Sequence, residues 1–328
     1  MAKNRKTRRD IYQEVTDQIL NYLDKGVIPW RNPIAKGTGD GWPKNLQTGK
    51  RYRGINVMLL AMKSAVAGFT SDYWMTFKQA KAKHGQVRKG EKGSLVTFWK
   101  VFETKDKKTG EEKSLPVLRH YTAFNIDQIA GIDAPDAPSK DSDKPPFEPI
   151  EKAESIVANF SDPPTISNDG GSRAFYRVKT DSVHLPDQNR FDCRENYYAT
   201  LFHELSHSTG IEKRLGRGLD TDPASFGSPN YSREELVAEI SAAFLCAACG
   251  ISPPTIEQSA AYLQGWITVL KSDKRLVVSA AGAAQKSADL ILGTTFTTAA
   301  SGSVQPTAIR EQGPVKTQRA LFPDKPVL

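Results

Sequence analysis

The pentapeptide HELSH at residues 203–207 limits the fold of this chain more than any other segment. It lies in a pattern typical of a packed helix, whose apolar members include Leu201, Phe202 and Leu205. Residues four apart on a helix share one face, so His203 and His207 can offer ring nitrogens to a single ion, with Glu204 beside them. The alternative is a solvent-facing helix that carries two histidines by chance. The apolar neighbours favour a packed helix with one polar stripe.

These residue types fit the chemistry of a catalytic zinc ion. Three protein ligands leave the fourth zinc position open, and the pKa of a water bound there falls to about 7. A glutamate beside the two histidines can take a proton from that water. We therefore predict a zinc-dependent hydrolase site of the zincin type with one Zn²⁺ per chain. In this site His203 and His207 are metal ligands and Glu204 is the catalytic base.

The candidates for the third metal ligand can be reduced by elimination. The chain has five histidines, and none follows His207. A three-histidine site of the metzincin type would need a histidine at position 213, where this sequence has Lys213. A downstream carboxylate is the natural alternative, and residues 232–239, SREELVAE, supply one on a predicted helix.

Glu235 is the favoured third ligand in this helix. Glu239, one turn later, can then hydrogen-bond a ligand histidine as an outer partner. The competing interpretation is structural, because Ser232 and Glu235 have the spacing of an N-terminal capping box. Glu234 and Glu239 are the alternative ligands. Tyr231 is a candidate catalytic residue that could hydrogen-bond the oxyanion of a tetrahedral intermediate, although a buried or capping tyrosine fits equally well.

Charge divides the chain into two unlike parts. Residues 1–130 hold 25 Lys and Arg against 12 Asp and Glu, whereas residues 131–328 hold 20 against 25. A surface that is basic only for solubility would explain a positive total but not this segregation. The asymmetry therefore suggests that the first part meets a polyanion and that the second does something else.

Composition also excludes several classes of protein. No apolar run approaches the roughly 18 to 20 residues of a membrane helix, so no membrane partner is expected. The basic N-terminus lacks the apolar segment of a secretory signal. Three cysteines argue against a disulfide scaffold, and we expect a protein that works in a reducing cytoplasm. Cys246 and Cys249 lie in an apolar helical pattern, which favours packed thiols over a metal or redox pair.

Aromatic residues are interleaved with cations throughout the basic part, where four of the five tryptophans lie. Cations that follow phosphates, together with aromatic faces on which unpaired bases stack, are what binding of single-stranded DNA requires. Because large aromatics dominate core burial, we expect about half of these tryptophans in the core. The candidate DNA-binding residues are Trp30, Arg51, Tyr52, Arg53, Trp74, Lys78, Arg88, Lys89 and Lys92.

Periodicity predicts an α+β fold of two domains. A basic domain of mixed α and β structure is expected over residues 1–130, a Pro- and Asp-rich linker over 131–149, a second domain over 150–293, and a disordered tail over 294–328. Helices are expected near residues 11–23, 55–67, 76–84, 195–208, 233–248, 255–271 and 277–292. Strands are expected at 94–102 and 115–124, paired as a hairpin, and at 175–185.

Several segments resemble a known family. Those of the first part resemble the N-terminal domain of the ArdC-type antirestriction proteins, and they are residues 12–16, 28–30, 45–56, 74–80 and 87–93. Residues 201–210 and 233–239 resemble the zincin-like metallopeptidase domain that follows it in that family. The resemblance runs through about residues 8–293 and leaves the tail uncovered.

The resemblance implies a module that binds single-stranded DNA, fused to a zinc metallopeptidase-like module of the glutamate type and encoded on mobile elements. Such proteins help incoming conjugative DNA to escape host restriction. It supports Glu235 as a ligand, because these zincins place the third ligand in a Glu-x-x-Ala helix like 235–238. The expected partners are single-stranded DNA and an unknown protein substrate or component of the restriction system. The rival hypothesis is a DNA-coating antirestriction protein whose zinc site is structural or vestigial; a metal-dependent nuclease is disfavoured, since no carboxylate cluster for two metals is present.

Overall fold

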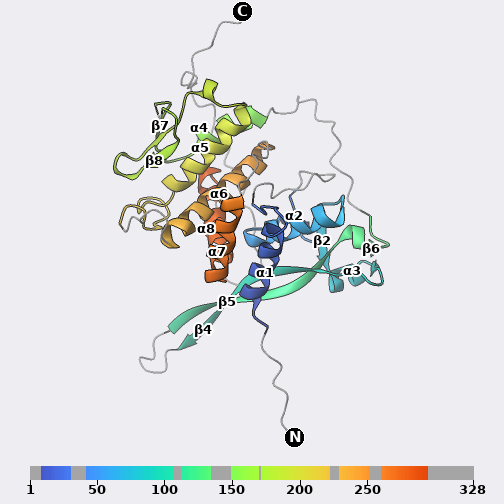
Figure 1. Cartoon of the computed structure of the whole chain (residues 1–328). Helices are drawn as coiled ribbons and strands as arrows, with labels where there is room; N and C mark the ends of the chain where they lie inside the picture. The colour runs from blue at the N-terminus through green and yellow to red at the C-terminus, as the bar shows by residue number, and fades with distance from the viewer. Residues whose placement is uncertain are drawn as a thin grey trace, which may run out of the picture.

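The computed structural model describes residues 9–30, 42–105, 112–133, 149–169, 171–221, 229–251 and 260–294. The predicted linker lies mostly outside the described residues, and the predicted disordered tail lies outside them almost entirely. Figure 1 shows the later helices gathered in one body and a long β-hairpin that projects from its lower side. None of the helices in the described ranges combines the length and apolar character needed to cross a bilayer.

Two helices of the basic part have the bounds that the sequence predicts. Helix α1 (Ile11–Leu23) begins at Asp10, whose side chain accepts a hydrogen bond from the Gln13 backbone N–H at 3.2 Å. Helix α2 (Ile55–Ala67) begins after Gly54, a residue with φ of 56°. Glycine adopts such a positive φ without steric cost, so it permits the sharp entry into the helix.

The strands of the basic part form a four-stranded sheet in the order β1-β2-β5-β4. These strands are β1 (Lys44–Asn45), β2 (Tyr73–Thr76), β4 (Ser94–Lys105) and β5 (Glu112–Asn125). The predicted hairpin is confirmed, and β4 and β5 pair over their whole length, from Ser94 opposite Ala123 to Lys105 opposite Glu112. Short strands β3 (Gln86–Val87) and β6 (Ile129–Ala130) pair with each other in a second sheet. Helix α3 (Phe77–Ala82) begins with a capping box at Thr76.

The second part begins with helix α4 (Pro149–Asn159), followed by a three-stranded sheet in the order β7-β9-β8. Its strands are β7 (Thr165–Ser167), β8 (Phe175–Arg177) and β9 (Ser182–His184). The prediction of one strand over 175–185 is therefore wrong. The chain turns back through a 3₁₀ turn at Val178–Thr180 and a left-handed Asp181 with φ of 46°, so β8 and β9 are antiparallel neighbours.

Four helices complete the second part. They are α5 (Arg194–Ser208), α6 (Pro229–Cys249), α7 (Ala260–Ser272) and α8 (Leu276–Ile291). Helix α6 packs against both α5 and α8, so it lies in the middle of this body. All four predicted helices are present, with ends that differ by a few residues from those expected.

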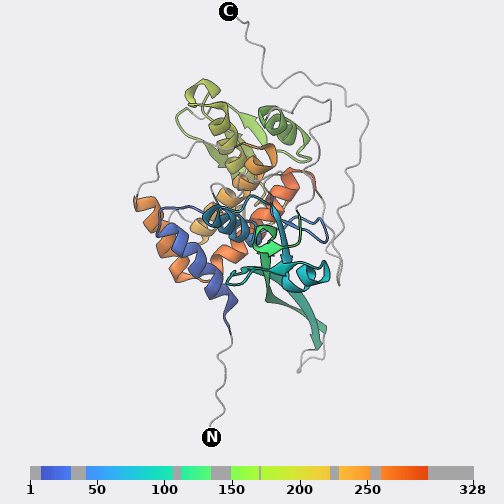
Figure 2. The ribbon, with the colours of Figure 1, turned by 90° about the vertical axis from the view of Figure 1, so that its right-hand side faces the viewer.

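The two parts share one hydrophobic core. Helix α1 lies beside α7 and α8 in both views of the ribbon (Figures 1 and 2). Trp30 is 1% exposed, its ring lies 5.7 Å from that of Trp266, and its indole N–H donates to Glu239 at 2.6 Å. Arg53 forms an ion pair with Asp289 on α8. The basic part and the helical part therefore stabilise each other through buried side chains.

Candidate metal centre

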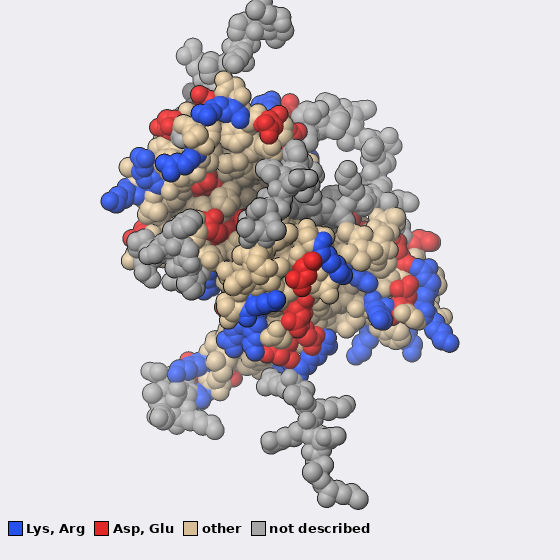
Figure 3. Space-filling model, viewed as in Figure 1, with Lys and Arg blue, Asp and Glu red and all other residues tan. Residues whose placement is uncertain are grey.

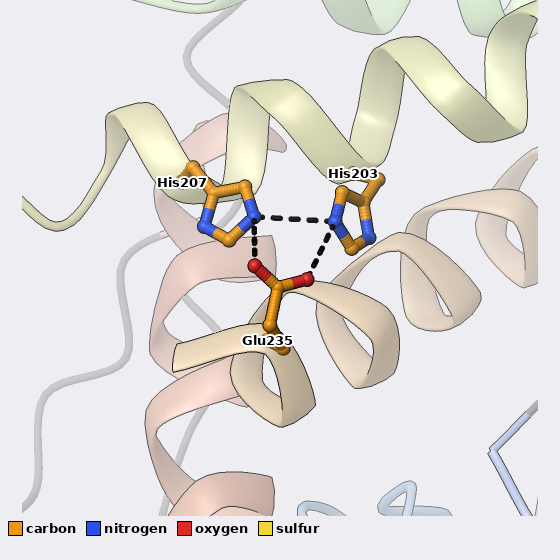
Figure 4. Close-up of side chains that lie close together, drawn as sticks. All are labelled: His203, His207 and Glu235. Atoms are coloured by element: carbon orange, nitrogen blue, oxygen red, sulfur yellow. Dashed lines mark hydrogen bonds and ion pairs between the residues drawn. The ribbon is translucent and has the colours of Figure 1, made fainter. Parts of the chain in front are cut away.

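Helices α5 and α6 bring the two predicted imidazoles and a carboxylate together (Figure 4). The Nε2 atoms of His203 and His207 are 3.1 Å apart. The carboxylate of Glu235 lies 3.5 Å from His203 Nε2 and 3.7 Å from His207 Nε2. The donor atoms of these three residues all lie within 4.8 Å of one another. Two elements far apart in the sequence thus converge on one point.

These separations fit a small divalent ion. Tetrahedral zinc with bonds of about 2.0–2.1 Å holds its ligand atoms roughly 3.3 Å apart. Two facing imidazole nitrogens and a carboxylate at 3.1 to 3.7 Å are already near that spacing. Imidazole nitrogen and carboxylate oxygen are also a donor set that zinc prefers. The arrangement fits a metal held by three side chains.

Glu234 orients one of the ligand histidines. Its carboxylate lies 3.3 Å from His207 Nδ1 and receives two N–H groups of Arg217, at 2.6 and 2.9 Å. Burial alone would raise the pKa of Glu234, but the hydrogen bonds from Arg217 and His207 hold it below its ordinary value. An ionised carboxylate can only accept, so His207 Nδ1 carries a proton, and Nε2 is the ring nitrogen that faces Glu235 and His203.

Arg217 was not foreseen, since nothing in its local sequence marks it. Besides Glu234 it bonds the Ser206 backbone carbonyl at 2.9 Å and the Thr209 hydroxyl at 2.8 Å. Gly210 makes room for it, because a Cβ there would stand 2.9 Å from the guanidinium. The end of α5 is therefore fixed against the loop that follows it.

Opposing charges surround the metal-binding atoms. Burial alone would raise the pKa of Glu235, but a hydrogen bond with His203 and the charge of His207 hold it below its ordinary value. For His203 burial acts in the opposite direction, yet the bond to Glu235 and the charges of Glu204 and Glu239 raise its pKa overall. The pocket thus favours a positive charge at its centre, which is what a cation supplies.

Glu204 is 8% exposed and comes from α5, which contacts strand β8. Burial raises the pKa of Glu204, while the charges of His203 and His207 and a backbone hydrogen bond from Tyr176 oppose that rise. A carboxylate with a raised pKa beside a metal site can accept a proton and return it. The role of Glu204 as a catalytic base stays a prediction of the HELSH motif.

Tyr231 and Glu239 both lie near the cluster. The Tyr231 hydroxyl hydrogen-bonds Glu235, and burial first, then the charge of Glu235, raise the pKa of the tyrosine to about 12. Glu239 accepts the Trp30 indole N–H at 2.6 Å and raises the pKa of His203 through its charge. Glu234, which the sequence suggests as an alternative ligand, lies 3.3 Å from His207 Nδ1 and so is an outer partner of a candidate ligand histidine.

The predicted aromatic DNA contacts lie in the core. Trp30, Tyr52 and Trp74 are 1%, 7% and 0% exposed, so none of them offers a free face to a base. Trp42 is also buried, whereas Trp99 is half exposed. The proposed stacking role of Trp30, Tyr52 and Trp74 is therefore corrected: alternation with cations in sequence also occurs where aromatic rings point inward.

The predicted cations fall into two groups. Lys78, Arg88, Lys89 and Lys92 are exposed, and Figure 3 shows lysine and arginine side chains projecting at the end of the molecule where α3 lies. Arg51 is exposed as well, with its guanidinium 5.4 Å from the Trp42 ring centroid.

Arg53 is half-buried in its ion pair with Asp289, so it joins the two parts of the chain instead of presenting a free charge.

The two cysteines of α6 are packed thiols. Cys246 and Cys249 are both buried and neither is in a disulfide. Burial raises the pKa of Cys249 to about 12, and it raises that of Cys246 as well. Such thiols are neither nucleophiles nor metal ligands at neutral pH.

Comparisons with known proteins agree with both halves of this description. Residues 9–124 match the family described as the N-terminal domain of anti-restriction factor ArdC, and residues 151–283 match the family described as zincin-like metallopeptidase. A metal-free crystal structure of the antirestriction ArdC protein from the R388 plasmid is 39% identical, with a TM-score of 0.66, and the match covers 86% of this chain and 97% of that one. The Mn(II)-bound form is 38% identical, with a TM-score of 0.68 and coverage of 87% and 98%.

Curated relatives are similar over nearly the same stretch. Protein y4eC of Sinorhizobium fredii is 35% identical over 291 residues, which are 86% of this chain and 92% of that protein. DNA primase TraC of Escherichia coli is 37% identical over 304 residues, which are 87% of this chain but only 27% of that primase. The chain therefore spans about a quarter of the length of that relative. Taken with the Mn(II)-bound relative, the cluster of His203, His207 and Glu235 is a divalent metal site.

Proposed function

Since the chain belongs to the family of ArdC antirestriction proteins, with an ArdC N-terminal domain followed by a zincin-like metallopeptidase domain, we propose that it is an antirestriction protein of a mobile element. In this proposal it binds single-stranded DNA without sequence preference and carries a zinc metallopeptidase active site. Its protein substrate is a component of the restriction system or another host protein. It acts in the bacterial cytoplasm, including that of a recipient cell, where it aids the establishment of incoming conjugative DNA.

The observation that carries the enzymatic half is the convergence of His203, His207 and Glu235 beside a buried Glu204. A zinc ion held by the first three would supply a Lewis acid for a scissile carbonyl and a lowered pKa for water. Glu204 accepts the proton of the attacking water on its carboxylate and passes it to the leaving amine. Tyr231, whose pKa of about 12 keeps the hydroxyl protonated, can donate a hydrogen bond to a developing oxyanion.

The DNA-binding half is supported by charge. The excess of cations in residues 1–130 is typical of a protein that binds a polyanion, and the exposed Lys78, Lys89 and Lys92 can contact phosphates, as can Arg88, which lies 3.9 Å from Glu91. A similar protein bears the name DNA primase, which associates this stretch of sequence with a protein that acts on DNA. We expect tight, salt-sensitive binding to single strands and weaker binding to duplex, and equal affinity for the two at moderate salt would contradict a preference for single strands.

Two measurements test the enzymatic half. Elemental analysis of the purified protein should find about one zinc per chain, and its absence after purification without chelators would count against zinc. A restriction-protection assay should then compare the wild type with Glu204→Gln, which keeps the metal ligands but removes the base. Loss of protection with retained metal supports proteolysis. Full protection by the variant would instead favour the rival function, a DNA-coating protein whose metal site is structural or vestigial.

A further inference from the structure

The β4–β5 hairpin leaves the body of the molecule with large apolar side chains in water. In Figures 1 and 2 its distal half extends beyond every helix. Phe98, Trp99, Val101 and Leu115 are 43%, 51%, 58% and 52% exposed. A two-stranded ribbon gains little stability by exposing such groups, and contiguous exposed apolar surface marks a binding site. The exposed apolar side chains therefore indicate that the hairpin binds a ligand.

The register divides the hairpin into two faces of different chemistry. Residues that oppose each other in an antiparallel pair point to the same face, and the face alternates along each strand. One face, which we name the stacking face, is formed by Phe98, Lys100, Phe102, Leu115, Val117 and Arg119. The reverse face carries Trp99, Val101, Glu103, Lys105, Glu112 and Pro116. Both acidic residues described in the hairpin, Glu103 and Glu112, therefore lie on the reverse face.

Aromatic rings and cations interleave on the stacking face. The Phe98 ring centroid lies 5.9 Å from that of Tyr121, which continues the row toward the body. Two cations approach the Phe102 ring, with Lys100 Nζ 5.0 Å and the Arg119 guanidinium 5.3 Å from its centroid. Lys100 and Arg119 are exposed. Rings flanked by cations, with no acid on the same face, suit a ligand that is both planar and anionic.

The reverse face is partly covered where the hairpin leaves the body. Trp99 lies 6.4 Å from Tyr12 of α1, and Arg9 bonds His120 at 3.0 Å. Glu103 and Glu112 would also repel a polyanion there. The two faces of one ribbon therefore differ in both access and charge, which makes the stacking face the accessible cationic one.

We propose that the stacking face of the β4–β5 hairpin is a binding surface for single-stranded nucleic acid, in which bases stack on Phe98 and Phe102 while Lys100 and Arg119 contact phosphates. Duplex is a poorer ligand because its bases are already stacked on each other. The inference rests on the proposed binding of single-stranded DNA and supplies the aromatic surface that Trp30, Tyr52 and Trp74 cannot provide from the core.

The test uses the full chain and a fluorescent oligothymidylate of twelve to fifteen residues, with binding followed by anisotropy. Phe98→Ala with Phe102→Ala should weaken binding by about 5- to 150-fold for each base that stacks. Val101→Ala, a truncation on the reverse face, should change affinity by less than about twofold. Circular dichroism and thermal melting check that each variant keeps the fold of the body.

A second pair of variants tests the electrostatic half. Lys100→Ala and Lys105→Ala each remove one exposed lysine from the same strand, but from opposite faces. Only Lys100→Ala should reduce the slope of log K against log salt, by about 0.7 for one phosphate contact. Photo-crosslinking of an iodouracil-containing oligonucleotide to the wild-type chain, followed by peptide mapping, should label the peptide that holds Phe98 and Phe102 without any substitution.

The outcomes separate this inference from the proposed function. If the wild type binds single strands and the stacking-face variants bind equally well, with crosslinks elsewhere, the inference fails and the function stands. If the wild type does not bind single-stranded DNA, both fail. If the phenylalanine variants change only the oligomeric state in ultracentrifugation and leave DNA affinity intact, the face is an interface between two copies and the inference is overturned.

Discussion

Replacing Glu234 with Gln should weaken metal binding although Glu234 is not itself one of the three converging ligands. The carboxylate accepts from His207 Nδ1 at 3.3 Å and from Arg217 at 2.6 and 2.9 Å. An amide of the same shape keeps an acceptor oxygen but loses the charge that fixes the histidine tautomer and raises the basicity of its other nitrogen.

The magnitude follows from one hydrogen bond. A bond to a charged acceptor contributes about 1.5–3 kcal/mol and a neutral one about half of that. The change at His207 therefore costs about 0.75–1.5 kcal/mol of metal affinity, or roughly four- to twelvefold in the dissociation constant. Glu234→Ala removes the acceptor entirely and should approach the hundredfold loss that is the upper end for outer-sphere partners.

Competition with a chromophoric chelator measures these affinities for zinc or Mn(II). Glu151→Gln, an exposed glutamate in the first turn of α4, removes the same charge far from any contact with His207 and serves as the matched control. The reasoning is refuted if Glu234→Gln binds metal within twofold of the wild type while Glu151→Gln does the same. A loss in both variants would point to general electrostatics instead of the oriented histidine.

Three further predictions concern stability. Adding zinc at about 100 times its dissociation constant should raise the free energy of unfolding by about 2.7 kcal/mol, seen as a higher melting temperature that a chelator reverses and that His203→Ala lacks. Trp30→Phe removes the indole N–H on Glu239 and should lower the free energy of unfolding by about 2 kcal/mol, so an unchanged melting curve would show that this bond is immaterial. Burial alone would raise the pKa of Asp181, but hydrogen bonds from Arg214 and other neighbours lower this pKa overall. The ionised Asp181 therefore stabilises the fold fully above the pKa of an unfolded Asp, near 4, and this stabilisation is lost as the pH falls below that value. Asp181→Asn should therefore lose less stability than the wild type between about pH 4 and pH 2, as followed by denaturant unfolding at each pH.

Helix α1 could be predicted from local signals, because it has both a capping residue and apolar periodicity. Asp10 and the four-residue spacing of Ile11, Val15 and Ile19 are enough to place α1. The run 175–185 was misjudged since strand-like composition cannot reveal a reversal. The turn depends on Asp181 in the left-handed region, held by Tyr176 and Arg214.

The part of the metal centre that depends on helical spacing could be predicted from the sequence. Two histidines four apart must share a face, so the sequence places them together whatever surrounds them. Adjacent glutamates point about 100° apart on a helix, so the sequence could favour Glu235 as the ligand but could not show that Glu234 backs His207. Arg217 comes from a loop whose course depends on tertiary packing. The inward direction of Trp30 and Trp74 is likewise decided by what packs over them.

The hydrogen bond from the Trp30 indole to Glu239 limits how this gene can be rearranged. The indole comes from the basic part and ends on the helix that carries Glu235, among side chains from both halves. Recombination that cut the chain between these halves would give each product an open, unfilled face where the other half had been. Recombination should therefore transfer this stretch as one block, and shuffled hybrids should fold only when both contributors preserve the complementary surface.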